Sequence, residues 1–319
     1  MVKVFIAGPI PEVGLNLLKE QGFDVDVYEG QGIIDQDSLK QGVKDADALI
    51  SLLSTNVDQS IIDAGKHLKI IANYGAGFNN IDITYARQKQ IDVTNTPKAS
   101  TNSTAELTFG LVLAVARRIP EGDTLCRTTT GFDGWAPLFF RGREVSGKTI
   151  GIIGLGEIGG AVARRAKAFD MTVLYTGPHQ KKDKEREIGA KYVDLDTLLK
   201  HSDFVTINAA YTPDLHHQID TEKFKLMKTT SYLINASRGP IVHEQALVQA
   251  LKDKEIEGAA LDVFEYEPEI TDALKSLDNV VLTPHIGNAT YESRDMMSKI
   301  VANDTICKLN HKQPKFLVN

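Results

Sequence analysis

Cysteine and tryptophan are scarce in this chain of 319 residues, which contains only Cys126, Cys307 and Trp135 of these two types. Two cysteines are too few for a disulfide-stapled scaffold, and so low a count fits a reducing compartment. It also argues against a metal site built from cysteine ligands, and we predict that no metal is bound.

Long hydrophobic runs are absent as well. The longest apolar stretch, residues 107–116, falls well short of the roughly 20 residues that a membrane-spanning helix needs. The first residues, MVKVFIAGPIPE, hold too short an apolar core for a secretory signal peptide and no small-residue cleavage site. We therefore expect a soluble, cytoplasmic protein that binds no membrane.

An excess of positive charge is also missing. Lys and Arg number 36 against 42 Asp and Glu, which leaves a net charge of −6, and no strongly basic patch offsets it. A nucleic-acid partner is therefore not expected. The hydrophobic fraction of 42% and the charged fraction of 24% are those of an ordinary globular protein, and the length indicates two domains.

What is present is an alternation of strand-like and helix-like segments. Short apolar runs typical of strands span residues 2–7, 23–28, 48–53 and 68–73 and, after a break, 149–153, 172–175, 203–207, 231–235, 258–262 and 280–282. Strands that alternate with helices predict parallel sheets covered on both faces. We therefore predict an α/β fold with two doubly wound parallel-sheet domains, the first comprising residues 1–100 and 287–319 and the second residues 101–286. The tail 288–309 reads as a helix that packs back onto the first domain.

The break between the two series contains a helix-start signal. Ser103 and Glu106 have the spacing of a capping box, in which the hydroxyl and the carboxylate satisfy backbone N–H groups at the helix start. The run that follows, LTFGLVLAVARR, is apolar on nearly every side, which predicts a buried helix.

Gly154, Gly156 and Gly159 form a G-x-G-x-x-G sequence that directly follows a predicted strand and opens a predicted helix. In this context the first glycine makes the turn, the second lets the backbone approach a pyrophosphate, and the third lets the helix pack on the strand. The phosphates would lie at the helix N-terminus, where free N–H groups favour negative charge. We predict a dinucleotide site that also includes Glu157 and Ile158.

The end of the following strand bears on the choice of dinucleotide. An NAD site normally has Asp or Glu about 20 residues after the glycine loop, to bind the ribose hydroxyls. Here Gly177 stands after Thr176 at that place, and no carboxylate precedes Asp183. His179 and Lys181 would attract a 2′-phosphate, so we predict a preference for NADP(H). The alternative is that these residues form only a solvated loop and that NAD(H) is held by other contacts.

Three segments near the C-terminus carry the predicted chemistry: NASRGP (235–240), LDVFEYEP (261–268) and TPHIGNAT (283–290). Together with the glycine loop they resemble the signature segments of the D-isomer-specific 2-hydroxyacid dehydrogenases, and the resemblance covers essentially the whole chain. It implies a flavodoxin-like substrate domain joined to a Rossmann dinucleotide-binding domain.

The residue chemistry agrees with this resemblance. Arg238 offers a permanently charged, planar fork that can bind the carboxylate of a 2-keto acid and polarise its carbonyl. His285 can give a proton to the carbonyl oxygen as a hydride arrives, and take it back in the reverse reaction. Glu267 would orient the imidazole and stabilise its protonated form. These three residues are the predicted catalytic set.

The resemblance implies further contacts. Positions that would touch the cofactor are Thr104, Thr212, Ala236, Ser237, Asp262 and Gly287, with Asp262 at the nicotinamide amide. Positions that would bind substrate are Leu53, Ser54, Gly75, Ala76 and Gly77, the last three through backbone N–H groups.

Within the family, the sequence is similar to glyoxylate/hydroxypyruvate reductases at Tyr175–Gly177 and in the loop GWAPLFF (134–140), whose Trp135 would reach toward the pocket of a partner in a homodimer. It departs from the family pattern where Ala210-Tyr211 replaces Pro-Leu and Pro178-His179 replaces an arginine.

We therefore predict an NADP(H)-preferring reductase of small 2-keto acids of the glyoxylate/hydroxypyruvate type. Two alternatives stay open: an NAD-dependent D-2-hydroxyacid dehydrogenase of a larger substrate, and a non-catalytic dinucleotide sensor. Tyr85 and Lys89 have the Tyr-x-x-x-Lys spacing of short-chain dehydrogenases, but they precede the glycine loop and are interpreted as a coincidence on an exposed helix.

Overall fold

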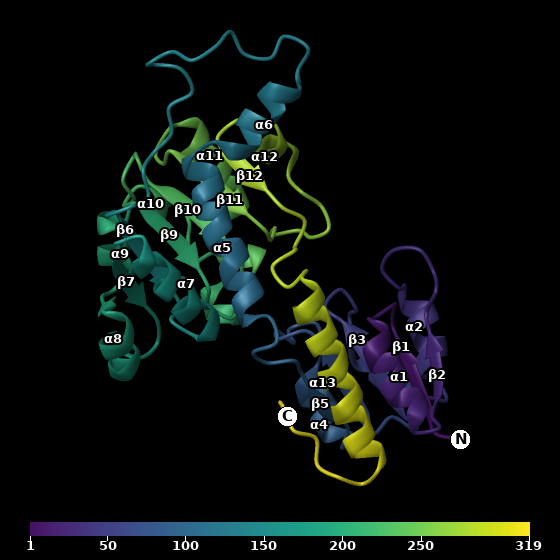
Figure 1. Ribbon diagram of the computed structural model, residues 1–319. Coiled ribbons are helices and arrows are strands. Elements are labelled where there is room, and N and C mark those ends of the chain that lie inside the picture. The colour runs from purple at the N-terminus through teal and green to yellow at the C-terminus, as the bar shows by residue number, and fades with distance from the viewer. The chain divides into compact units, whose positions relative to one another are not determined.

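The computed structural model describes residues 1–319 and divides into two compact units (Figure 1). Unit 1 comprises Met1–Ser100 and Asn288–Asn319, and unit 2 comprises Thr101–Gly287. None of the helices combines the length and the apolarity needed to cross a membrane.

Unit 1 is built on a five-stranded sheet in which every pair is parallel and the strand order is β2-β1-β3-β4-β5. This is the flavodoxin-like order of a doubly wound sheet. The strands are β1 (Lys3–Ile6), β2 (Asp24–Val27), β3 (Ala48–Leu52), β4 (Ile70–Tyr74) and β5 (Asp92–Thr94).

The helices of unit 1 are α1 (Glu12–Glu20), α2 (Gln36–Val43), α3 (Gln59–Ala64), α4 (Ile83–Gln88) and the C-terminal α13 (Tyr291–Leu309). The tail helix α13 packs on α1, where the Ser298 hydroxyl donates to the Pro11 carbonyl oxygen at 2.8 Å and accepts from the Gly14 N–H at 3.2 Å. A Cβ on Gly14 would lie 2.2 Å from the Ser298 hydroxyl oxygen, so only glycine permits this close approach.

Unit 2 contains a seven-stranded, all-parallel sheet of order β12-β11-β10-β9-β6-β7-β8. Its strands are β6 (Thr149–Ile153), β7 (Thr172–Thr176), β8 (Lys191–Tyr192), β9 (Phe204–Ile207), β10 (Tyr232–Asn235), β11 (Gly258–Leu261) and β12 (Val280–Leu282). The chain extends the sheet in one direction from β6 to β8 and in the other from β9 to β12. Ligands of such sheets bind at this switch point, outside the carboxyl ends of the strands.

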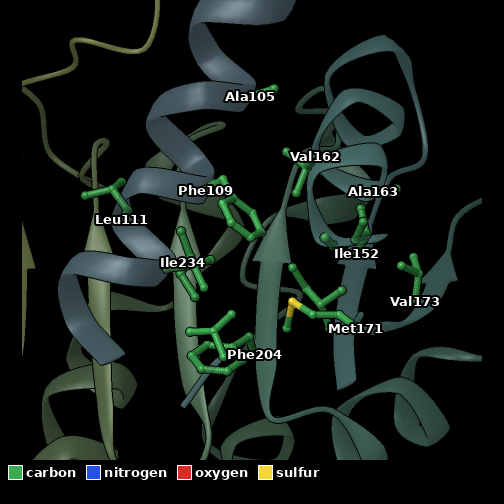
Figure 2. Close-up of a cluster of buried hydrophobic side chains, with 14 of the residues drawn as sticks. Ala105, Phe109, Leu111, Ile152, Val162, Ala163, Met171, Val173, Phe204 and Ile234 are labelled. Carbon is green, nitrogen blue, oxygen red and sulfur yellow. The ribbon is translucent and has the colours of Figure 1, made fainter. Parts of the chain in front are cut away.

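The helices of unit 2 cover both faces of its sheet. They are α5 (Thr101–Ala116), α6 (Ile119–Arg127), α7 (Glu157–Ala168), α8 (Lys182–Ile188), α9 (Leu195–His201), α10 (Thr221–Phe224), α11 (Glu244–Lys252) and α12 (Asp272–Lys275). Figure 2 shows Phe109 of α5 and Val162 of α7 over Ile152 and Ile234 of the sheet. The alternate strand positions, such as Ile153, point into a second core on the other face. Burial on both faces explains the continuous apolar runs of these strands, and the predicted fold class is confirmed.

The capping-box prediction is wrong. Helix α5 begins at Thr101, so Ser103 lies within its first turn and is buried. Glu106, the other half of the expected box, instead forms an ion pair of 2.8 Å with Arg165 on α7. The hydroxyl–carboxylate spacing also occurs inside helices, where tertiary contacts rather than capping occupy the side chains.

The predicted boundary at residue 287 also differs by one position. Gly287 belongs to unit 2, because its N–H donates to the Asp262 carboxylate at 2.8 Å and its carbonyl accepts from the Thr104 hydroxyl at 3.1 Å. The sequence does not predict two of the strands, because they are too short to form an apolar run: β5 has three residues and β8 has two.

Candidate active site

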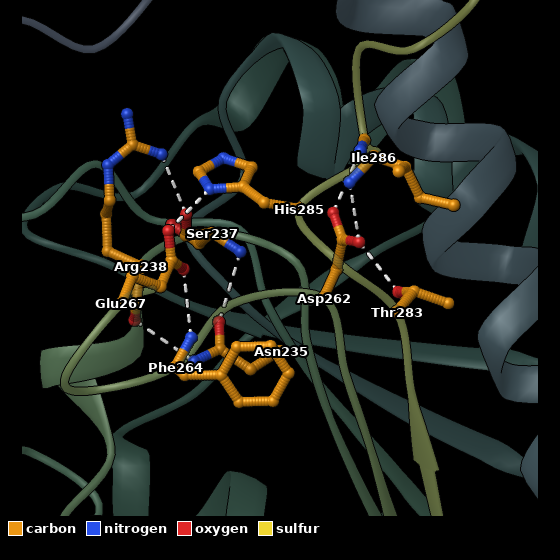
Figure 3. Close-up of polar contacts among 10 residues, drawn as sticks. Asn235, Ser237, Arg238, Asp262, Phe264, Glu267, Thr283, His285 and Ile286 are labelled. Atoms are coloured by element: carbon orange, nitrogen blue, oxygen red, sulfur yellow. Dashed lines mark hydrogen bonds and ion pairs between the residues drawn. The ribbon is translucent and has the colours of Figure 1, made fainter. Parts of the chain in front are cut away.

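Arg238, Glu267 and His285 follow three strands that are neighbours in the sheet of unit 2. Arg238 comes after β10, Glu267 after β11 and His285 after β12. Because parallel strands end at the same edge of a sheet, the three side chains gather there, as Figure 3 shows. The structure thus brings the predicted catalytic residues together.

His285 and Glu267 form an imidazole–carboxylate pair. The distance between His285 Nδ1 and Glu267 Oε2 is 2.8 Å, and Glu267 Oε1 accepts the Phe264 N–H at 2.9 Å (Figure 3). The contact at Nδ1 places a proton on that nitrogen and turns Nε2 away from the carboxylate. Both side chains remain about one third exposed, at 31% and 35%. The imidazole is therefore oriented and still accessible to a substrate.

Electrostatics favour the ionised form of Glu267. Burial by itself would raise the pKa of this carboxyl, but the hydrogen bond and charge of His285, the Phe264 N–H and the charge of Arg238 together hold its pKa below the ordinary value. A carboxylate that stays ionised in this position can stabilise positive charge on the His285 imidazole.

Arg238 is held by a turn that Asn235 organises. The fully buried Asn235 amide donates to the Arg238 carbonyl at 3.0 Å and accepts the Ser237 N–H at 3.1 Å. Burial lowers the pKa of the Arg238 guanidinium, and the charge of Glu267 opposes that shift. A guanidinium retains its proton even so. Arg238 therefore presents a partly desolvated positive charge beside the His285–Glu267 pair.

Asp262 ties down the segment that carries His285. Its carboxylate accepts hydrogen bonds from the Thr283 hydroxyl at 2.6 Å and from the Ile286 and Gly287 N–H groups at 2.8 Å each. Burial raises the pKa of Asp262, although these three donors lower it in part. His285 has a positive φ of 53°, a conformation that non-glycine residues rarely adopt, and this network holds it there.

The glycine loop has the geometry that dinucleotide binding needs. Gly154 has φ +93°, and a Cβ there would lie 2.7 Å from the Ala209 backbone. A Cβ on Gly159 would lie 2.2 Å from the Gly154 carbonyl oxygen, which is the close helix–strand approach expected of the third glycine. Gly156 caps α7 and faces open space, with Glu157 and Ile158 opening the helix. The loop fits a pyrophosphate against the N-terminus of α7.

The loop after β7 is anchored at both ends. The Gly177 carbonyl accepts from the Tyr192 hydroxyl at 2.9 Å, and the Lys181 N–H donates to the Tyr175 hydroxyl at 2.7 Å. The side chains of His179 and Lys181 are exposed, and a Cβ on Gly177 would meet no atom within 4 Å.

The structure adds a cation that the sequence analysis missed. Lys184 Nζ lies 2.7 Å from the Gly156 carbonyl oxygen and 3.3 Å from Glu157 Oε1. Lys184 thus brings a positive charge to the glycine loop itself. In the sequence, Lys184 is one of several charged residues in the stretch HQKKDKEREIGAK (179–191), and nothing local singles it out.

The other predicted contacts within unit 2 are placed as follows. Thr104 bonds the Gly287 carbonyl, the Ser237 hydroxyl bonds the Ala209 carbonyl, and Ala236 lies in the turn before Arg238. Thr212 is exposed and precedes a short 3₁₀ helix, η1 (Pro213–Leu215).

In unit 1, the predicted substrate residues lie after neighbouring strands. Leu53 and Ser54 follow β3, and residues 75–77 follow β4. Two asparagine side chains hold the loop of residues 75–77. The Asn73 amide donates to the Gly77 carbonyl and the Asn95 amide donates to the Ala76 carbonyl, each over a donor–acceptor distance of 2.7 Å.

Tyr85 and Lys89 have a structural explanation of their own. Both contact Asp63, Tyr85 with its hydroxyl at 2.9 Å and Lys89 in an ion pair of 2.7 Å. Their spacing therefore reflects a surface network of unit 1.

A substitution in the glycine loop tests the packing argument. We expect Gly159→Ala to destabilise unit 2 by about 1–3 kcal/mol through overpacking against Gly154 and to abolish dinucleotide binding. Gly110→Ala is the matched control: Gly110 lies in the interior of α5 with open space around it, so alanine should stabilise the helix by roughly 0.5–1 kcal/mol. Thermal melting and dinucleotide titration measure both effects. Unchanged melting and binding in Gly159→Ala would contradict the prediction.

Comparison with known proteins identifies the family. The D-isomer specific 2-hydroxyacid dehydrogenase NAD binding domain matches residues 109–287, more than half of the chain. A Staphylococcus saprophyticus protein named as a 2-hydroxyacid dehydrogenase is 85% identical over 319 residues, the whole length of both chains.

Solved structures agree. The TT0316 protein from Thermus thermophilus is 35% identical with a TM-score of 0.94 and covers 100% of both chains. An NADPH-dependent glyoxylate/hydroxypyruvate reductase from Sinorhizobium meliloti, in complex with NADP and malonate, is 29% identical with a TM-score of 0.85 over 99% of this chain and 96% of that chain. The resemblance inferred from the three signature segments is therefore confirmed, and the chain belongs to the D-isomer-specific 2-hydroxyacid dehydrogenases.

Proposed function

We propose that this dehydrogenase reduces small 2-keto acids of the glyoxylate and hydroxypyruvate type, with NADPH as the preferred hydride donor. The observation that carries the proposal is the His285–Glu267 pair beside Arg238 at the carboxyl ends of three adjacent strands. A proton donor next to an anion-binding cation is what reduction of a keto acid requires.

The residues divide the chemistry among them. Arg238 binds the substrate carboxylate and polarises the keto oxygen. Bound NADPH supplies a hydride to the carbonyl carbon. His285 Nε2 donates its proton to the carbonyl oxygen, which yields the 2-hydroxy acid and a neutral imidazole, and solvent then returns the proton. Glu267 holds the ring through Nδ1 and stabilises the protonated state that precedes transfer.

The proposal extends to residues that would position the two ligands. Backbone N–H groups of residues 75–77 would bind the substrate carboxylate, with Leu53 and Ser54 as walls. Cofactor contacts would come from the glycine loop and from Thr104, Thr212, Ala236, Ser237, Asp262 and Gly287.

We further propose a cytoplasmic homodimer. Trp135 is 86% exposed in a segment where Phe132, Leu138 and Phe139 are exposed too. Such a cluster of large apolar side chains is typical of a protein–protein contact.

The cofactor preference rests on the loop after β7. No carboxylate occupies the position of Gly177, and the exposed His179 and Lys181 could face a 2′-phosphate. The Sinorhizobium meliloti reductase, whose structure holds NADP, supports the same choice.

Initial rates test the substrate and the cofactor together. Glyoxylate and hydroxypyruvate are each reduced with NADPH and with NADH, and we expect turnover that favours NADPH. Turnover that favours NADH would overturn the proposed preference for NADPH but would agree with the proposed reductase activity. If neither acid is reduced, the alternative to test is an NAD-dependent dehydrogenase of larger 2-keto acids, assayed with NADH.

A charge placed at Gly177 tests the preference directly. We expect Gly177→Asp to lower kcat/KM for NADPH about tenfold or more, which corresponds to about 1.4 kcal/mol of repulsion, and to spare NADH. The open space at Gly177 admits the new side chain. Gly177→Ala is the control, since it removes the glycine without adding charge. Equal losses for both cofactors would count against the assignment.

A further inference from the structure

We propose that His217 is a positioning residue. It joins the turn that carries Arg238 to the segment that carries Glu267, and it thereby holds the catalytic side chains in their relative positions. This inference rests on the proposed roles of Arg238, Glu267 and His285.

The backbone of His217 is bound to the Arg238 turn. Its N–H donates to the Pro240 carbonyl at 2.8 Å, two residues after Arg238, and the Ile219 N–H donates to the Ile241 carbonyl at 3.0 Å. The segment 217–219 therefore runs alongside residues 240–242 as a short parallel bridge. Any shift of one segment displaces the other.

The side chain of His217 is bound to the Glu267 segment. His217 Nε2 lies 2.7 Å from Glu265 Oε1, and Glu265 lies two residues before Glu267. The Glu265 side chain is only 6% exposed, and its second oxygen accepts the Glu244 N–H at 2.9 Å. The Glu265 N–H in turn donates to the Glu244 carboxylate at 3.0 Å. Glu265 is therefore fixed through its carboxylate and through its backbone N–H.

The charge of Glu265 is stabilised by the same partners. Burial would raise its pKa, but the Glu244 N–H, the His217 imidazole and the Tyr266 hydroxyl outweigh burial and lower it. A buried carboxylate that lost the His217 donor would have to recruit water or move, because an unpaired charge in the interior is costly.

The two segments also touch each other directly. A Cβ on Gly239 would lie 1.9 Å from the carbonyl carbon of Phe264, so the Arg238 turn packs against the Phe264–Glu265 peptide without spare room. On the other side of Phe264, its N–H donates to Glu267 Oε1. A displacement of Glu265 is therefore passed to Glu267 through one peptide unit.

The neighbour of His217 supplies a matched control. The His216 ring stacks on the His217 ring at 3.9 Å, but His216 is exposed and the one polar contact of its side chain is a 3.4 Å approach to the Tyr211 hydroxyl. His216→Ala removes the same kind of side chain from the same loop without touching the link to Glu265.

The experiment compares His217→Ala, His217→Gln and His216→Ala for kcat, KM and the pH dependence of keto-acid reduction. We expect His217→Ala to lower kcat roughly 10- to 100-fold, since a displacement of about 1 Å can have such an effect, with a smaller change in KM. The alkaline limb of its pH profile should move to lower pH, because a displaced Glu267 no longer stabilises the protonated His285. His217→Gln should recover most of the loss, because its amide N–H can still donate to Glu265.

A purely structural role predicts something different. It would lower the melting temperature or the active fraction and leave the pH profile in place, and that result overturns the proposal. Glu265→Asp is the second variant, for use if His217→Ala does not fold. It keeps the charge but withdraws it from His217 and should show the same shift of the alkaline limb, and an unshifted limb also overturns the proposal.

The same series separates this inference from the proposed function. If His285→Ala is inactive while His217→Ala matches His216→Ala, the positioning role is wrong and the catalytic assignment stands. If His285→Ala keeps the wild-type rate, both are wrong.

Discussion

Replacement of His285 by alanine is expected to lower kcat for glyoxylate or hydroxypyruvate reduction by about 10²–10⁴-fold, the range that a positioned general acid contributes. The reason is that His285 is the group held by Glu267 with Nε2 turned outward, and alanine leaves no proton donor in its place. Dinucleotide affinity, measured by titration, should change little, because the glycine loop is untouched. His201→Ala, at the exposed end of α9, is the control and should behave as wild type.

Glu267→Gln separates orientation from charge in the same pair. An amide can still accept from His285 Nδ1, but it cannot stabilise positive charge on the ring. We expect a smaller loss than in His285→Ala, together with an alkaline limb displaced to lower pH. For the first prediction, a near wild-type kcat in His285→Ala would show that His285 is not the proton donor.

The lowered pKa of Glu267 sets the sign of a second effect. A carboxyl whose pKa is lower in the folded protein contributes stability above its unfolded pKa and loses it as the pH falls through the folded value. The stability difference between wild type and Glu267→Gln should therefore shrink on acidification, which thermal melting from neutral to acidic pH measures.

Arg238→Lys is expected to lower kcat/KM for the keto acid roughly 100-fold or more, although the positive charge is kept. A lysine ammonium cannot bind a carboxylate and a keto oxygen with two parallel N–H donors, and each hydrogen bond to a charged group is worth about 1.5–3 kcal/mol. The Asn235 contacts are made to backbone atoms, so the turn itself should survive the substitution.

Two controls complete this prediction. Arg186→Lys, on the exposed face of α8, should leave kcat/KM unchanged. Added guanidinium should restore part of the activity of Arg238→Ala, because the missing fork can be supplied from solution. Equal kcat/KM values for wild type and Arg238→Lys would show that Arg238 acts through charge alone or stands outside the substrate site.

Much of this protein is determined by local sequence. The strand runs, the glycine spacing from Gly154 to Gly159 and the three signature segments are periodic or contiguous patterns, so they predict two parallel sheets and the family without any long-range information. The proposed catalytic set could be named for the same reason: Arg238, Glu267 and His285 each follow a segment that the sequence predicts as a strand, and parallel strands end at one edge.

The tertiary structure alone decided the contacts that span distant segments. Glu106 pairs with Arg165 instead of capping α5, and Lys184 reaches back to the Gly156 carbonyl. His217 meets Glu265 across 48 positions of sequence. Such pairings depend on the strand order and on the helix packing that it imposes, and side-chain type and spacing do not encode them locally. The physical reason is that a local pattern selects a backbone conformation, whereas the partner of a charged side chain is selected by whatever the fold brings within about 3 Å of it.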